Sequence, residues 1–160
     1  MKNSKISIRH SKLSDLAEIQ RMFVDTISAI CKVDYSPEQI KVWTSSIENT
    51  QRWIDKLSSQ YFLIAELDNK IVGFASLGNN DYLDFLYVHK DYQRQGIADR
   101  LYNDIEAEAI RKESKVLTSD VSITAKAFFE KKGFRTIQKQ TKIIKNIEIV
   151  NYKMVKKLLQ

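Results

Sequence analysis

YLDFLYVHKDYQRQGIADRL, residues 82–101, joins an apolar run to an amphipathic one through a loop that holds Gly96, one of only four glycines in the chain. The apolar run, residues 82–88, predicts a buried β-strand, and the residues after Gly96 predict a helix. The inner positions of that helix are expected to be Leu101, Ile105, Ala109 and Ile110. A helix that begins at a loop glycine presents free backbone N–H groups and the positive end of its dipole there, and both attract anions. The stretch therefore indicates an anion-binding loop, with a plain strand-to-helix turn as the alternative.

On both sides of this stretch the hydrophobic pattern changes between helix and strand periods. Residues 6–10 predict an opening strand, and helices are expected from about residue 14, from residue 36 and after residue 50. Ser36, Pro37 and Gln39 fit a capping box at the start of the second helix. The remaining expected elements are strands at 61–67 and 71–77, a strand at 115–121, a short helix at 124–132, and strands at 134–144 and 147–155. This order predicts a mixed-sheet α/β fold.

The composition is that of an ordinary globular protein. Of the 160 residues 43% are hydrophobic and 29% are charged, so we expect a single domain over residues 1–160 with a substantial core. No apolar stretch approaches membrane-spanning length and the N-terminus has no apolar signal segment, so no membrane partner is expected. The single cysteine, Cys31, suits a reducing cytoplasm. The formal charge of +6 comes from scattered lysines, which favours a solvated surface and makes a nucleic-acid partner unlikely.

Two motifs resemble those of a known superfamily. Gln93-x-x-Gly96-x-Ala98, directly after the strand 82–88, resembles the acetyl-CoA pyrophosphate motif of the GNAT N-acetyltransferases. Further along, ITAKAFFEKKGF resembles the second signature of that family, with matches at Ala125, Phe128, Phe129, Gly133 and Phe134. DYSPEQIKVW, LYVH and NYKM are similar to segments of a bacterial GNAT subgroup whose members mostly lack an assigned substrate. The resemblance covers nearly the whole chain and implies an α/β fold with a mixed, mostly antiparallel central sheet of about seven strands flanked by helices.

The resemblance also implies a reaction, in which an amine attacks the thioester of acetyl-CoA directly and no metal takes part. The positions that bind CoA in the family correspond here to Leu86, Tyr87, Val88, Gln93, Arg94, Gln95, Gly96, Ile97, Ala98, Ser122 and Phe129. The amide of Leu86 lies where family members polarise the thioester carbonyl, so Leu86 is implied as catalytic through its backbone. Phe129 departs from the pattern, because many members have a tyrosine there that protonates the departing thiolate. Phenylalanine has no hydroxyl, which leaves the role of the acid unassigned.

Asp84 is the candidate catalytic carboxylate, since it interrupts the apolar central strand. Alternation is expected to place Asp84 on the same face as Leu86, within reach of an amine at the thioester. Asp84 would act as a general base; a hydrogen-bonded structural acid and an anchor for the substrate ammonium are the alternatives. Tyr35 and Tyr152 either border the acceptor pocket or belong to the core or its rim. No His, Cys and carboxylate cluster has metal-ligand spacing.

The leading hypothesis is therefore an N-acetyltransferase that moves an acetyl group from acetyl-CoA to a primary amine. The acceptor is an unidentified small molecule or peptide. The alternative, which Phe129 favours, is a catalytically weak or silent acyl-CoA-binding or sensing module of the same fold. A nucleic-acid-binding module rests on charge alone and lacks a recognition motif. A homodimer is allowed, and a cytoplasmic location is expected.

Overall fold

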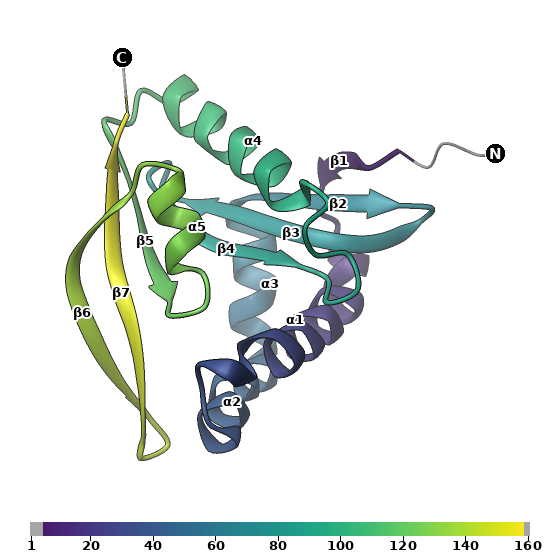
Figure 1. Ribbon diagram of the computed structural model, residues 1–160. Coiled ribbons are helices and arrows are strands. Elements are labelled where there is room, and N and C mark those ends of the chain that lie inside the picture. The colour runs from purple at the N-terminus through teal and green to yellow at the C-terminus, as the bar shows by residue number, and fades with distance from the viewer. Residues whose placement is uncertain (1–4, 159–160) are drawn as a thin grey trace.

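Seven strands form one sheet in the order β1-β2-β3-β4-β5-β7-β6 in the computed structural model, which describes residues 5–158 (Figure 1). The strands are β1 (Ser7–His10), β2 (Tyr61–Leu67), β3 (Lys70–Gly78), β4 (Tyr82–Val88), β5 (Val116–Ser122), β6 (Arg135–Ile144) and β7 (Ile147–Lys157). The helices are α1 (Leu16–Ile30), α2 (Pro37–Thr44), α3 (Thr50–Ser59), α4 (Ile97–Arg111) and α5 (Lys126–Lys131), with 3-10 turns at Leu13–Asp15, Cys31–Val33 and Ser45–Glu48. Neighbouring strands are antiparallel except β4 and β5. The predicted α/β fold with a mixed, mostly antiparallel sheet flanked by helices is confirmed.

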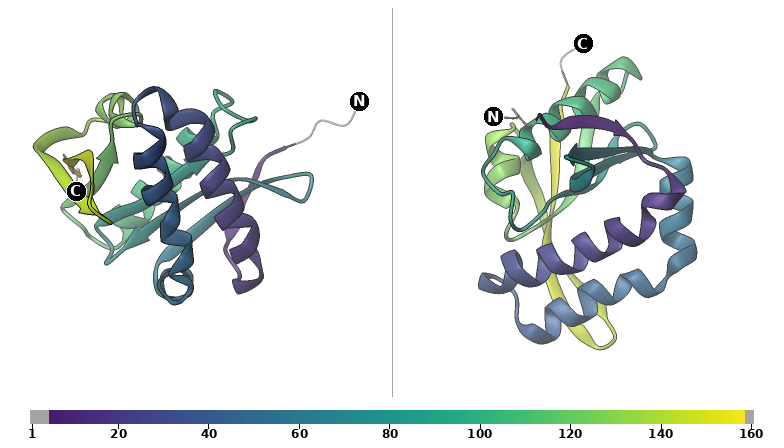
Figure 2. Two further views of the ribbon diagram at one scale, coloured as in Figure 1. Left: turned by 90° about the horizontal axis from the view of Figure 1, so that it is seen from below. Right: turned by 90° about the vertical axis from the view of Figure 1, so that its right-hand side faces the viewer.

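Helices cover the sheet on both faces, and each face has its own core (Figures 1 and 2). On the first face, which we call the α4 face, α4 and α5 pack against the sheet in a core that includes Leu101, Ile105 and Phe129. On the second, the α3 face, α1 and α3 pack in a core that includes Phe23 and Trp53. The right-hand view of Figure 2 shows α1, α2 and α3 together on this side of the sheet. Burial of the apolar side chains on both faces is the main driving force for this fold.

Local signals in the sequence have their expected structural effect. The capping box of α2 is present: Ser36 Oγ accepts from Gln39 N at 3.1 Å, and Gln39 Oε1 accepts from Ser36 N at 2.8 Å. One expectation is wrong, because Ile110 is 40% exposed rather than an inner residue of α4. It lies well over one turn past Ile105, which rotates it away from the buried stripe of the helix.

β4 and β5 are neighbours at one end only. Within residues 5–158 their register consists of one pair, Tyr82 and Thr118, and Ser119 Oγ donates to Leu83 O at 2.7 Å just beyond it. After this point the two strands run apart, as Figure 1 shows, with α5 in front of the gap. We call the region between the diverging ends of β4 and β5 the splay. Backbone groups of β4 that are directed toward it have no strand to pair with.

Candidate active site

β4 contains a β-bulge at Asp84. Leu83 and Phe85 are paired with consecutive residues of β3, so Asp84 is one extra residue in β4. As a result Leu83 and Leu86 both pack on the α4 face, whereas Phe85 packs on the α3 face. The prediction that Asp84 and Leu86 share a face is therefore wrong. The bulge interrupts the alternation, and the Asp84 carboxylate contacts side chains of α3 and of the residue that follows it.

The direction of the β4 backbone follows from the same register. His89 N donates to Val72 O of β3 at 2.9 Å. Because backbone groups alternate along a strand, Tyr87 also directs its N–H and C=O toward β3, while Leu86 and Val88 direct theirs toward the splay. The side chain of Gln93 agrees with this assignment, since its Nε2 donates to Val88 O at 2.6 Å. The amide of Leu86 is thus aimed into the gap between the two central strands.

The loop between β4 and α4 ends in a helix N-terminus. Gly96 has a φ of 79°, a left-handed conformation that glycine adopts without strain, and an added Cβ there would meet no atom within 4 Å. In the described part of the chain the amides of Ile97, Ala98 and Asp99 have no hydrogen-bond acceptor, as expected for the first turn of a helix. The loop thus presents free donors, the positive end of the helix dipole and open space, which together suit an anion.

A second glycine sets the position of α4. A Cβ at Gly73 of β3 would lie 3.0 Å from Ile97 Cγ2, 3.0 Å from Leu101 Cδ1 and 3.1 Å from Tyr87 O. These distances are shorter than ordinary van der Waals contacts, so the first turn of α4 packs this close to the sheet because residue 73 has no side chain. The side chain of Ile97 is fully buried in this contact, so only the backbone amide of Ile97 is available to bind an anion at the loop.

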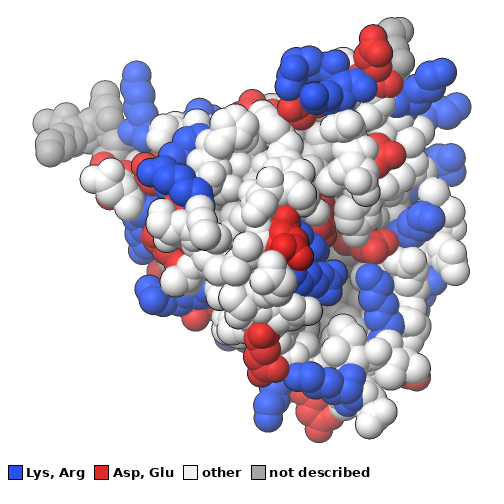
Figure 3. Space-filling view, turned by 180° about the vertical axis from the view of Figure 1, so that it is seen from behind, with Lys and Arg blue, Asp and Glu red and all other residues white. Residues whose placement is uncertain are grey.

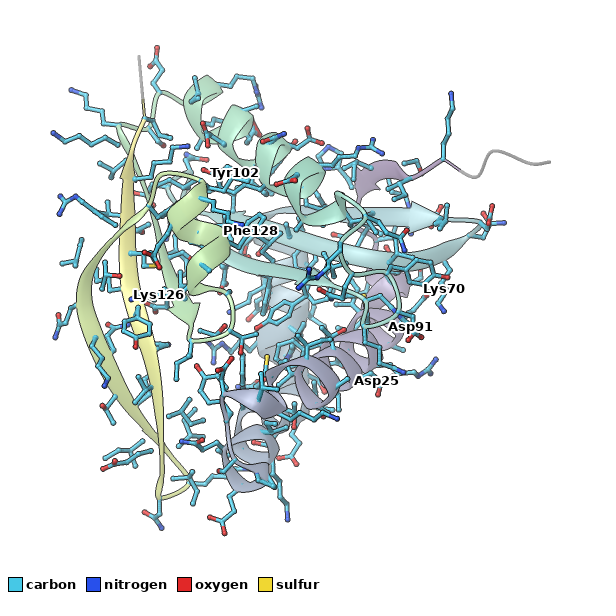
Figure 4. The ribbon with its side chains drawn as sticks, in the orientation of Figure 1. Asp25, Lys70, Asp91, Tyr102, Lys126 and Phe128 are labelled. Carbon is cyan, nitrogen blue, oxygen red and sulfur yellow. The ribbon has the colours of Figure 1, made fainter. Side chains whose placement is uncertain are left out.

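The residues expected beside the CoA arm on β5 and α5 lie at the far side of the splay. Ser122 Oγ accepts from Ala125 N at 3.1 Å, so its hydroxyl is engaged at the turn that leads into α5. Phe129 is 4% exposed, and its ring makes an edge contact with Phe134 at 5.0 Å between ring centroids. Figure 4 shows the neighbouring Phe128 between α5 and α4. Residue 129 therefore contributes an apolar ring within the core and no hydroxyl.

On the α3 face the Asp84 carboxylate is already bonded. Lys56 Nζ of α3 and Nε2 of Gln60, the residue that follows α3, each lie 2.8 Å from Asp84 Oδ2. Lys56 Nζ also lies 4.8 Å from the centroid of the Phe85 ring, which stacks on Trp53 at 4.9 Å. The sequence interpretation missed Lys56 and Gln60. Their spacing of one helical turn places them side by side, but only the tertiary structure brings them to Asp84.

A second carboxylate, Asp120 of β5, lies across the same face. Tyr82 Oη donates to Asp120 Oδ2 at 3.1 Å, Gln140 Nε2 donates to Oδ1 at 3.0 Å, and Lys142 Nζ lies 3.3 Å from Oδ2. Burial works against ionisation of Asp120, but the hydrogen bond from Gln140 and the charge of Lys142 lower the pKa of its carboxyl overall. Figure 3, which views the protein from the side of α3, shows acidic and basic side chains around a hollow.

Two further residues considered from the sequence have structural contacts. Tyr35 is 5% exposed; its hydroxyl donates to Val150 O at 2.7 Å and accepts from Ile123 N at 2.9 Å, and burial raises its pKa to about 12. These bonds tie the segment before α2 to β7 and to the end of β5. Tyr152 is half-buried, and Lys126 Nζ lies 4.6 Å from the centroid of its ring; Figure 4 labels Lys126 at the start of α5.

Two kinds of site have no counterpart among residues 5–158. His, Cys, Asp and Glu side chains nowhere form a group of three that could hold a metal ion. No helix of this part of the chain combines the length and the apolar surface that crossing a bilayer requires.

A gap between two parallel central strands, with a strand amide aimed into it and a helix N-terminus beside it, suits an extended ligand that carries an anionic group. Comparison with known proteins gives the family. The family model described as acetyltransferase (GNAT) domain matches residues 31–156, and the chain belongs to this family.

Individual relatives agree with the family assignment. The chain is 35% identical over 137 residues to the uncharacterized N-acetyltransferase YafP of Escherichia coli K12, and the match covers 86% of each protein. A GCN5-related N-acetyltransferase from Rhodopseudomonas palustris has 35% identity and a TM-score of 0.92, with 99% of both chains covered. The PaiA N-acetyltransferase of Thermoplasma acidophilum, solved in complex with coenzyme A, has a TM-score of 0.81 at 20% identity and covers 96% of this chain and 99% of its own. At this lower identity the similarity concerns the fold.

Proposed function

We propose that this protein transfers the acetyl group of acetyl-CoA to a primary amine of a small molecule or peptide, by direct attack of the amine on the thioester. The observation that carries the proposal is the Leu86 amide, which is directed into the splay close to the anion-binding loop. A thioester carbonyl beside this amide receives a hydrogen bond that strengthens as negative charge develops on the oxygen during attack. This stabilises the transition state more than the ground state, as catalysis requires.

The residues around the splay fit acetyl-CoA. The unpaired amides of Ile97, Ala98 and Asp99, with the open space beside Gly96, suit a pyrophosphate. The backbone groups of β4 that face the splay suit the amide groups of a pantetheine arm. The fold neighbour with bound coenzyme A supports the same ligand. Acetyl-CoA supplies an activated acyl group whose thiol is a tolerable leaving group. Gln93, Arg94 and Gln95 belong to the same loop, and we place them, with Ser122 and Phe129, along the ligand.

We assign Asp84 to the acceptor side of the reaction. Lys56 and Gln60 both contact Oδ2, and among the described residues no donor contacts Oδ1. That oxygen is therefore available to an incoming ammonium, or to a water that relays its proton. A neutral amine is required for attack, so a carboxylate that accepts the proton near the thioester serves the reaction directly. With no hydroxyl at Phe129, we expect the departing thiolate to take its proton from water or from the amine itself.

Release of free CoA thiol in the presence of a panel of primary amines tests this proposal. We expect amine-dependent release by the wild-type protein and much slower release, at the same acetyl-CoA concentration, by Gly96→Glu, in which a carboxylate stands at the anion loop. A second candidate function is a silent acyl-CoA-binding module, and the specific observation in its favour is the buried, apolar Phe129. Binding of CoA by calorimetry without thiol release for any amine would support that candidate and contradict acetyl transfer.

A further inference from the structure

Lys56 has the surroundings that an acceptor amine needs. Its ammonium lies 2.8 Å from the Asp84 carboxylate and 4.8 Å from the centroid of the Phe85 ring. A carboxylate combined with the face of an aromatic ring is a common way for proteins to bind an alkylammonium group. We call the Asp84 carboxylate and the Phe85 ring together the cradle. The Lys56 side chain is 19% exposed, so its ammonium is held in the cradle and does not extend freely into solvent. The cradle shows which chemistry it binds: a primary amine on an unbranched methylene chain.

The cradle is also close to the place of reaction. Asp84 comes two residues before Leu86, so their Cα atoms are at most roughly 7 Å apart, the value for a regular strand, because the bulge at Asp84 bends the backbone. The anion loop and α4 lie on one face of the sheet, and α3 with Lys56 lies on the other. A thioester that enters the splay from the α4 face is therefore open to attack from the α3 face. The four rotatable bonds of the lysine stem allow Nζ to leave the carboxylate and approach the acyl carbon.

We propose that Lys56 is an acceptor within the protein itself, and that its Nζ is acetylated when acetyl-CoA is bound and no free amine competes. The proposal rests on the acetyl-transfer activity proposed above. Nζ loses one proton through Asp84 to water, and its lone pair forms the N–C bond to the acetyl carbon. The C–S bond breaks and its electron pair passes to sulfur. The second proton lost from Nζ ends on the thiolate, so the products are acetyl-lysine, the CoA thiol and one proton in solvent.

Acetylation at this position has a structural consequence that can be measured. Acetyl-lysine is neutral, so the ion pair with Asp84 is lost while the carboxylate stays mostly buried, with 14% of its side chain exposed. A buried charge that loses its partner destabilises the folded state. We expect the modified protein to melt at a lower temperature than the unmodified protein, and a free primary amine to slow the modification because it competes for the same cradle.

The test is a time course of wild-type protein with acetyl-CoA and no added amine, followed by peptide mass spectrometry. We expect Lys56 to be acetylated at least about tenfold faster than the exposed lysines Lys41 and Lys131, because the reacting groups are held together in one molecule. The rate constant should be independent of protein concentration, and Gly96→Glu should reduce the difference in rate between Lys56 and the exposed lysines. Lys56→Arg keeps a cation beside Asp84 but removes the amine that reacts. Lys131→Arg is the matched control, because it replaces an exposed lysine and leaves Lys56 in place.

The outcomes separate this proposal from the function on which it rests. Amine-dependent thiol release without modification of Lys56 would overturn the self-acetylation and leave acetyl transfer intact. Modification of Lys56 at the same rate as Lys41 and Lys131 would also overturn it, because that result describes non-selective chemistry. Absence of both thiol release and Lys56 modification would remove both proposals. Fast, selective modification that added amines slow would establish that Lys56 occupies the acceptor position.

Discussion

Substitution of Gly96 tests the anion loop directly, because the structure separates its two effects. A φ of 79° is unfavourable for a residue that has a side chain, but a Cβ added at Gly96 would meet no other atom within 4 Å. Gly96→Ala therefore adds only backbone strain, because a Cβ in the left-handed region crowds its own backbone, and we expect a cost of about 1–2 kcal/mol of stability. For a chain of this size the midpoint of thermal unfolding should fall by roughly 2–8 °C. Little effect on CoA affinity is expected from the methyl group.

Gly96→Glu adds the same strain and a negative charge next to the expected pyrophosphate. Two like charges about 5 Å apart repel by about 1–3 kcal/mol at an effective dielectric constant of about 20–80. CoA affinity should therefore fall by roughly 5- to 100-fold relative to Gly96→Ala. Calorimetry with CoA measures this difference, and circular dichroism gives the melting temperatures. Gly133→Ala is the control, since Gly133 has a φ of 96° but lies at the end of α5 beside Lys156. It should melt earlier and bind CoA normally, whereas wild-type affinity in Gly96→Glu would refute the placement of the pyrophosphate.

Three further changes address the reaction and the stability of the fold. Asp84→Asn should lower kcat/KM by about a hundredfold while CoA affinity is retained. Normal turnover would show that this carboxylate takes no part in the reaction. Lost activity together with a much lower melting temperature would show that its role is structural. Phe129→Tyr should keep or raise kcat, because it restores a hydroxyl, and a CoA-bound structure with this ring far from the sulfur would contradict the reason. Asp15 accepts hydrogen bonds from Arg9 at 2.9 Å, which lower its pKa, so the stability it contributes is present above about pH 4 and lost as the pH falls further. Asp15→Asn should make the free energy of unfolding depend less on pH below about pH 4. An unchanged pH dependence would show that the Arg9–Asp15 pair does not cause it.

The parts of the fold that the sequence predicts are those with local signals. Ser36 and Gln39 specify the start of α2 through groups only three residues apart, and Gly133 ends α5 through its own backbone conformation. The anion loop belongs to the same class, because a strand, a glycine and a helix follow one another directly. Local chemistry decides each of these features, so a single sequence is enough to find them.

The acceptor side of the site depends on contacts between distant segments, and the sequence interpretation failed there. YLDFLYV has the pattern of a regular strand, and nothing in it marks Asp84 as an extra residue. The bulge exists because β3 pairs with β4 in two registers, before and after Asp84. The partners of the carboxylate, Lys56 and Gln60, come from α3 and from the residue after it, and the strands β2 and β3 separate them from β4 in the sequence. Such pairings are fixed by tertiary packing, which a single sequence does not reveal.

The splay also divides the sheet into two parts. Strands β1 to β4 form one panel of the sheet, and β5, β7 and β6 form another. The strand register that joins the panels, between Tyr82 and Thr118, lies at one end, and elsewhere the panels are held together by the core on the α4 face, which contains residues of both, such as Leu83 and Val121. The acyl-CoA arm proposed above would pair with β4 and touch β5, and it would thus bridge the two panels where no strand pairing does.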